Sequence, residues 1–184
     1  MLKGLFMNKK KIILSIIIGL LVFSFINKRF NKKEDIETFN ESFINPEFYR
    51  ILDIDKWTEK KSPMNYTQLE NAKIKVTSKD KKDIESITNI LNNGKLIPIE
   101  KSSFDQYWDN TYNTDRFWLY IFMDANKQKT GCYPANIIIE NNLTFYVDAF
   151  NQSNGKSIYL KGKMSQDEFN LIEKIYKKEE KVKS

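Results

Sequence analysis

The sequence of 184 residues contains no histidine and only one cysteine, Cys132. Without histidine, the chain has no Ser-His-Asp or Cys-His catalytic group, no histidine ligand for zinc and no histidine that could respond to pH. A single cysteine cannot form an intramolecular disulfide, so the folded part must depend on its hydrophobic core. A lipoprotein-type anchor is also excluded, because no cysteine lies near the N-terminal apolar segment.

Arginine is scarce as well, since only Arg29, Arg50 and Arg116 occur among 30 basic residues. Residues 1–33 carry eight basic and no acidic residues, which leaves 22 basic against 24 acidic residues in the remainder. The basic pI of about 9.1 therefore belongs to the N-terminus, and the rest of the chain is nearly neutral. Nucleic-acid readers concentrate positive charge on a folded surface and favour arginine. The sequence thus excludes a nucleic-acid partner.

The N-terminus contains an apolar run, Ile12–Ile26, between lysines 9–11 and the basic pair Lys28-Arg29. As a helix it spans about 22 Å, which is short of the ~30 Å hydrocarbon core but suits a short anchor or a signal segment. The sequence favours an uncleaved signal anchor with the N-terminus in the cytoplasm and the following domain outside the cell. The alternative is secretion after cleavage near Ser24, the only tolerable cleavage position.

Three parts are expected along the chain: a basic tail and signal anchor at 1–33, a helical stalk and loop at 34–71, and a globular domain at 72–184. The stalk is predicted to contain two helices separated at Asn45, the second running from Pro46 to about Ile54.

Alternation of apolar and polar residues predicts a series of strands in the globular domain: 73–77, 96–99, 117–124, 135–140, 143–150 and 157–161. A helix at 81–92 is expected behind the N-cap Asp80, and a second helix begins at the capping box Ser165–Glu168. Asn141-Asn142 predicts a tight hairpin. The expected fold class is α+β, with an antiparallel meander of five to six strands, two capped helices on one face, and a single N-terminal transmembrane or signal-anchor helix.

The segments at 80–95 and 165–176, with a sheet between them, resemble small signal-anchored or secreted α+β proteins of low-GC Gram-positive bacteria. The resemblance covers residues 72–176 and concerns pattern and composition. It implies an extracytoplasmic location and no activity.

Aromatic residues are concentrated between Phe104 and Phe122. In the strand at 117–124, alternation places the aromatic residues Trp118 and Tyr120 away from the capped helices. The candidate binding residues on this face are Trp118, Tyr120, Tyr146, Tyr159 and Trp108. The face is expected to be either a platform for glycan or peptide, or a second core covered by residues 34–54. The covered core is favoured because Phe39 and other apolar residues of that segment need burial.

Candidate acid and base groups are limited to the carboxylates Asp105, Asp109 and Asp115, which lie in the aromatic segment. Paired carboxylates beside aromatic residues are typical of glycosidases, although ordinary loops also contain them. The turn at 151–155 does not supply calcium ligands at the required spacing. No catalytic residue, metal or cofactor is therefore assigned.

The expected function is non-catalytic binding of a protein or glycan ligand by a membrane-anchored, extracytoplasmic domain. One alternative is an accessory or immunity-type membrane protein that acts through a protein partner. The other is a carboxylate-based hydrolase that acts on cell-wall glycan.

Overall fold

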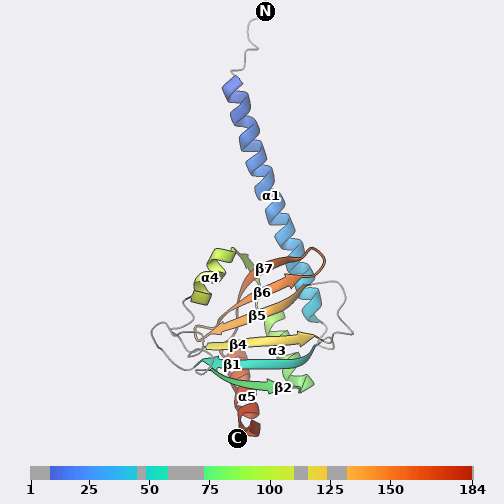
Figure 1. Ribbon diagram of the computed structural model, residues 1–184, viewed down its shortest axis with the longest axis vertical. Helices are drawn as coiled ribbons and strands as arrows, with labels where there is room; N and C mark the ends of the chain where they lie inside the picture. The colour runs from blue at the N-terminus through green and yellow to red at the C-terminus, as the bar shows by residue number, and fades with distance from the viewer. Residues whose placement is uncertain (1–8, 45–48, 58–72, 110–115, 124–131, 184) are drawn as a thin grey trace, which may run out of the picture. The chain divides into compact units, whose positions relative to one another are not determined.

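The computed structural model describes residues 9–44, 49–57, 73–109, 116–123 and 132–183 (Figure 1). Contacts divide the chain into two units, Met1–Glu34 and Asp35–Ser184. The helices are α1 (Lys9–Ile44), α3 (Lys81–Asn93), α4 (Lys101–Asp109) and α5 (Gln166–Lys183). The strands are β1 (Tyr49–Trp57), β2 (Lys73–Ser78), β3 (Ile97–Ile99), β4 (Arg116–Met123), β5 (Cys132–Glu140), β6 (Thr144–Asn151) and β7 (Lys156–Lys163).

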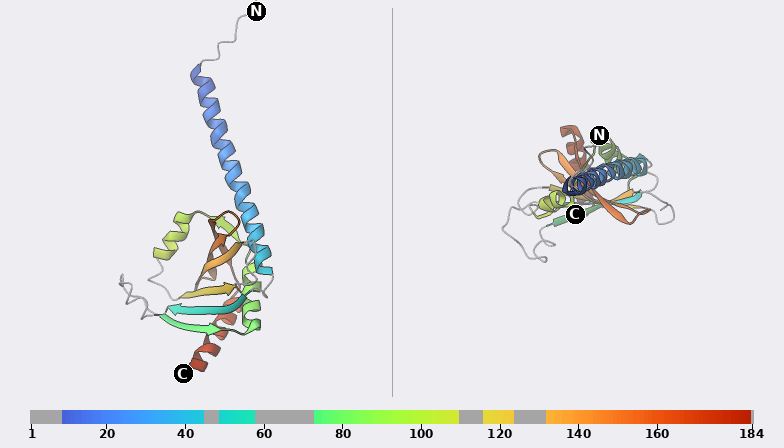
Figure 2. Two further views of the ribbon diagram at one scale, coloured as in Figure 1. Left: turned by 45° about the vertical axis from the view of Figure 1, so that its right-hand side comes forward. Right: turned by 90° about the horizontal axis from the view of Figure 1, so that it is seen from above.

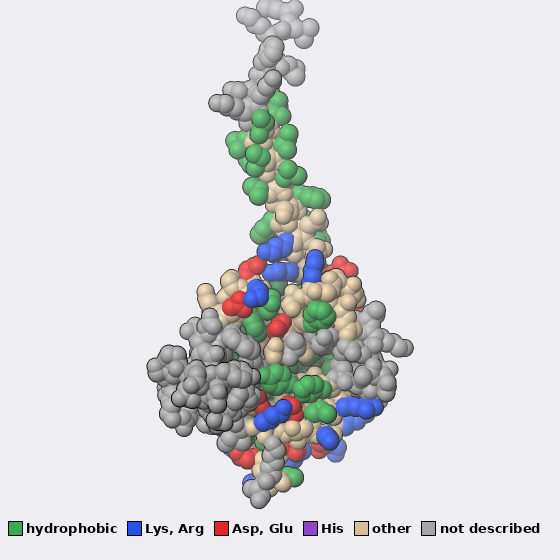
Figure 3. Space-filling model, viewed as in Figure 1, with side chains coloured by type: hydrophobic (Ala, Val, Ile, Leu, Met, Phe, Trp, Pro, Cys, Tyr) green, Lys and Arg blue, Asp and Glu red, His purple; other side chains and the backbone are tan. Residues whose placement is uncertain are grey.

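The described part of the first unit is the N-terminal portion of α1. In this helix, residues Ile12–Glu41 form a span that is long and apolar enough to cross a membrane, and the most apolar window of this span is not buried by protein. Figure 3 shows its hydrophobic side chains exposed along the visible side of the helix. The single apolar N-terminal helix expected from the sequence is thus present.

The second unit is built on one sheet of seven strands in the order β2-β1-β4-β5-β6-β7-β3. Every neighbouring pair is antiparallel. The strands β4 to β7 form the expected meander, while β1 lies between β2 and β4 and β3 lies at the opposite edge. The α+β class and the antiparallel sheet are confirmed, but the sheet is larger than predicted.

The additional strand is β1, and the prediction of a helix from Pro46 to about Ile54 is wrong. Leu52 and Ile54 are fully buried on one face, and Asp53 and Asp55 alternate with them. This period of two matches a strand that pairs on both sides. Long-range pairing with β2 and β4 therefore determines the conformation here.

The main hydrophobic core lies between one face of the sheet and the helices α3 and α5. It contains Ile84 and Ile87 of α3, Ile172 of α5 and the inward-facing residues Phe117 and Leu119 of β4. Both helices begin as predicted. Asp80 Oδ1 accepts a hydrogen bond from the Lys82 backbone N–H at 2.9 Å, and the Ser165 N–H donates to Glu168 Oε2 at 2.6 Å.

The other face of the sheet carries α4, which occupies part of the segment expected to be an aromatic loop (Figure 2). Phe104 of α4 packs there against Ile138 of β5 and Tyr146 of β6. We call this surface the α4 face. The expectation that residues 34–54 cover it is wrong, because Phe39 is fully buried in the main core instead.

Candidate functional site

The α4 face brings together three of the five aromatic residues that were predicted from the sequence to bind a ligand. Tyr120, Tyr146 and Tyr159 belong to one small cluster with Phe104 and Ile138. They come from β4, β6 and β7, whose register aligns them on one side of the sheet. The side chains of the other two candidates, Trp108 and Trp118, lie outside the described part. A binding role for the five residues stays a prediction.

The cluster is buried at its centre and accessible at its margin. Tyr146 is only 2% exposed, and the Lys161 Nζ lies 5.7 Å from the centroid of its ring. The Phe104 and Tyr159 rings pack with centroids 5.1 Å apart. Tyr120 and Tyr159 are half-buried, and Phe122 beside them on β4 is 47% exposed. A ligand could therefore reach the margin of this face but not its centre.

A row of polar side chains crosses the α4 face beside the aromatic residues. The register pairs Thr77 with Asp53, Asp53 with Tyr120, Asn136 with Asp148, and Asp148 with Tyr159. The pairing of Leu119 with Ile137 brings Tyr120 level with Asn136, so the row is continuous. We call these residues the polar row: Thr77, Asp53, Tyr120, Asn136, Asp148 and Tyr159.

Asp53 lies between Thr77 and Tyr120 in the polar row, and both of its carboxylate oxygens have partners. Its Oδ1 accepts a hydrogen bond from the Thr77 hydroxyl at 2.6 Å, and its Oδ2 lies 2.5 Å from the Lys75 Nζ. A buried carboxylate with an ammonium and a hydroxyl partner is a stable structural arrangement. Asp53 therefore holds β1 and β2 together.

Asp148 in the middle of β6 differs from Asp53. Its Oδ2 accepts a long hydrogen bond of 3.5 Å from the Asn136 side-chain amide. Its Oδ1 is buried and has no hydrogen-bond partner among the described residues. Burial raises the pKa of Asp148, and the negative charge of Asp105 adds to this, whereas the Asn136 hydrogen bond and the Lys101 charge lower it. An incompletely hydrogen-bonded carboxyl group in a strand is costly for the fold, which makes Asp148 a candidate for a functional residue.

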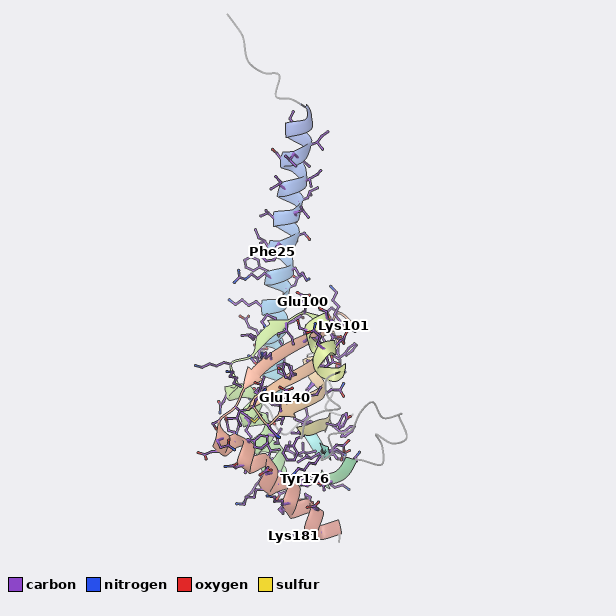
Figure 4. All side chains as sticks on the ribbon, turned by 90° about the vertical axis from the view of Figure 1, so that its left-hand side faces the viewer. Phe25, Glu100, Lys101, Glu140, Tyr176 and Lys181 are labelled. Carbon is purple, nitrogen blue, oxygen red and sulfur yellow. The ribbon has the colours of Figure 1, made fainter. Side chains whose placement is uncertain are left out.

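The helix α4 adds charged groups beside Asp148. The Lys101 Nζ and Asp105 Oδ2 form an ion pair of 2.8 Å on the exposed side of the helix. The hydrogen bond from Lys101 to Asp105 raises the pKa of the Lys101 ammonium. Figure 4 shows Lys101 at the start of α4. Two other carboxylates were predicted as acid or base groups, Asp109 and Asp115. The Asp109 side chain and all of Asp115 lie outside the described residues.

Metal binding finds no support in the described ranges, where no group of three or more Cys, Asp and Glu side chains could hold an ion. A surface groove of about 470 Å³ lies along α5, whose position Figure 4 marks with Tyr176 and Lys181. One of its lining residues is Lys178, whose Nζ bonds to Asp83 Oδ2 at 2.7 Å and Asp80 Oδ2 at 3.2 Å. This groove lies on α5, which packs on the opposite side of the sheet from the α4 face.

Neither Asp148 nor Asn136 was predicted from the sequence as a functional residue. A signal for Asp148 exists, because a carboxylate within the apolar segment 145–150 shares the face of Tyr146 by alternation. No comparable local signal marks Asn136, whose position opposite Asp148 follows only from the register of β5 and β6.

No known family matches this chain, and no curated protein sequence or solved structure is significantly similar to it.

Proposed function

We propose that this protein is a single-pass membrane protein whose extracytoplasmic domain acts by binding a ligand on the α4 face. The exposed apolar portion of α1 and the basic residues on both sides of it support membrane anchoring. The near-neutral composition of residues 34–184 supports recognition by specific contacts rather than by a strong electric field.

The observation that carries the binding function is the half-buried carboxyl group of Asp148. Its Oδ1 has no hydrogen-bond partner among the described residues, and its Oδ2 has only the long bond from Asn136. A ligand that donates a hydrogen bond to this carboxyl group would recover part of the free energy that its burial costs. The half-buried rings of Tyr120 and Tyr159 lie in the same row and offer apolar contact area. Polar groups at the margin of an aromatic cluster are typical of ligand sites.

Membrane topology is tested by protease treatment of intact cells that express the full chain. Cleavage should remove residues after Lys33 and spare the N-terminus. Complete protection in intact cells, with cleavage after lysis, would place the domain in the cytoplasm and refute the topology.

The location of the binding site is tested by measuring how full-length protein in detergent micelles binds to isolated cell envelopes. Asp148→Asn and Tyr120→Ala should each weaken binding. The matched control is Asp167→Asn, which changes an exposed carboxylate on α5. If the α4-face variants bind as well as the wild type, the ligand site lies elsewhere.

A carboxylate-based hydrolase is the second candidate, favoured by the neighbouring charges of Asp148 and Asp105. A raised pKa suits a general acid, and an ion-paired carboxylate suits a base or nucleophile. Hydrolysis of cell-wall glycan that stops in both Asp148→Asn and Asp105→Asn, with the proteins still folded, would establish an enzyme. Absence of hydrolysis by the wild type, with binding intact, favours the non-catalytic function.

A further inference from the structure

Three ammonium groups of the protein itself lie on the α4 face or on the helix α4 beside it. The Lys75 Nζ lies 2.5 Å from Asp53 Oδ2, and the Lys101 Nζ lies 2.8 Å from Asp105 Oδ2. The Lys161 Nζ lies 5.7 Å from the centroid of the Tyr146 ring. The face therefore stabilises alkylammonium groups in two ways, through carboxylates and through an aromatic ring.

Asp148 lies on the same face but holds no ammonium group. Its bonded neighbour is the neutral amide of Asn136 on β5, and Tyr159 lies opposite it on β7. The charged groups of α4 that act on it are Lys101 and Asp105, and the Lys101 ammonium is bonded to Asp105. No ion pair joins Asp148 to a lysine or arginine in the described part of the chain, and its buried Oδ1 accepts no hydrogen bond there.

On the basis of the proposed function, we propose that the α4 face binds a lysine side chain of a protein or peptide partner, with its ammonium group against Asp148 and its methylene chain against the Tyr159 ring. A primary ammonium group donates a strong hydrogen bond to the half-buried carboxylate and also balances its charge. The hydroxyl group of a sugar supplies only the donor. Lysine methylenes pack on apolar surface while the charged end reaches the carboxylate.

The proposal is tested by NMR titration of isotope-labelled full-length protein in detergent micelles. The probe is Nα-acetyl-lysine-methylamide, compared with its Nε-acetylated form, which has no charge. The free amine should shift the backbone signals of Asn136, Asp148 and Tyr159 in a saturable manner. The Nε-acetylated form should bind at least ~10-fold more weakly, because the charged hydrogen bond is lost.

Asp148→Asn should weaken binding of the amine by at least ~10-fold, whereas the exposed-carboxylate control Asp167→Asn should leave it unchanged. Burial raises the pKa of Asp148, so affinity should increase as pH rises through that pKa and the carboxylate ionises. Affinity should fall again as the amine loses its proton near pH ~10.

Three results would overturn the proposal: no saturable shift with the amine, equal affinity for the acetylated probe, or unchanged affinity in Asp148→Asn. N-acetylglucosamine and triacetylchitotriose serve as the sugar probes, because neither carries an ammonium group. If either shifts these signals while the lysine probe does not, the lysine partner is refuted but the binding function of the α4 face survives. If envelope binding is also insensitive to the α4-face variants, both proposals fail.

Discussion

The side-chain amide of Asn151 donates a hydrogen bond of 2.6 Å to Asp35 Oδ1, although 116 residues separate the two in the sequence. Both residues are buried. The Asn151 Oδ1 also accepts from the Ser153 backbone N–H at 2.9 Å, which fixes the turn between β6 and β7. Asn151 therefore joins this turn to Asp35, where the second unit begins.

Asp35→Ala should lower the free energy of unfolding by about 1–3 kcal/mol, because it leaves the buried Asn151 amide without its acceptor. Thermal and urea unfolding of the full chain in detergent micelles measures the loss. Asn154→Ala is the control, since Asn154 reaches Asp35 only at 3.5 Å and its other bond, from the Lys156 backbone N–H at 3.0 Å, is exposed. An equal effect of the two substitutions would show that the Asn151 bond has no special importance.

Phe145 is fully buried and packs closely against Gly162. A Cβ on Gly162 would collide with the end of the Phe145 ring and would lie 2.8 Å from the Gly94 carbonyl oxygen. Gly162→Ala should therefore cost about 1–3 kcal/mol through overpacking. Urea unfolding of the single variants and of the combined Gly162→Ala/Phe145→Leu variant measures their coupling. The combined loss should be smaller than the sum of the single losses, and simple additivity would contradict this explanation.

Lys95 follows the C-terminal cap of α3 and has a positive φ of 46°. Such a conformation costs about 1–2 kcal/mol for a residue with a Cβ, and Lys95 is exposed. Lys95→Gly should raise the free energy of unfolding, because glycine adopts a positive φ without strain. The increase should be at most about 1 kcal/mol, because glycine also increases the conformational entropy of the unfolded chain. Lys95→Ala should change stability little. A gain from alanine equal to that from glycine would exclude backbone strain as the cause.

Local signals in the sequence were sufficient for the two capped helices and for the strands of the meander. Asp80 and Ser165 make the predicted cap hydrogen bonds within three residues of themselves, so no long-range information was needed. The hairpin at Asn141-Asn142 was also predicted, but the positive φ falls on Leu143, at 65°. The loop has three residues rather than two, with the Leu143 N–H bonded to the Glu140 carbonyl at 3.0 Å.

Features that depend on long-range pairing were not accessible from local patterns. The segment around Leu52 has helical spacing behind a favourable Asn45-Pro46 start, and only pairing with β2 and β4 makes it a strand. The aromatic face could be located by alternation. The residue that covers part of it, Phe104, and the polar partner Asn136 depend on how α4 and β5 are placed. The sequence therefore indicated the aromatic residues of the candidate site but not its carboxyl group.

Asp148 should make the stability of the protein depend on pH. Because burial raises its pKa in the folded state, the folded protein holds this proton more tightly than the unfolded chain does. The resulting stabilisation is complete below the unfolded pKa of about 3.9 and is lost as pH rises through the folded pKa. Asp148→Asn removes this loss, so the free energy of unfolding of the variant minus that of the wild type should increase from pH 3 to pH 7.

Urea unfolding of the full chain in non-ionic micelles at several pH values measures this difference, and other carboxylates largely cancel in the subtraction. Asp167→Asn should show no such gain, because Asp167 lies in the first turn of α5, where a negative charge is favourable. A flat or falling difference for Asp148→Asn would mean that the Asp148 carboxylate is well stabilised in the folded protein. The Asp148 carboxylate would then not require a further hydrogen-bond donor, and the proposed binding function of the α4 face would lose the observation that supports it.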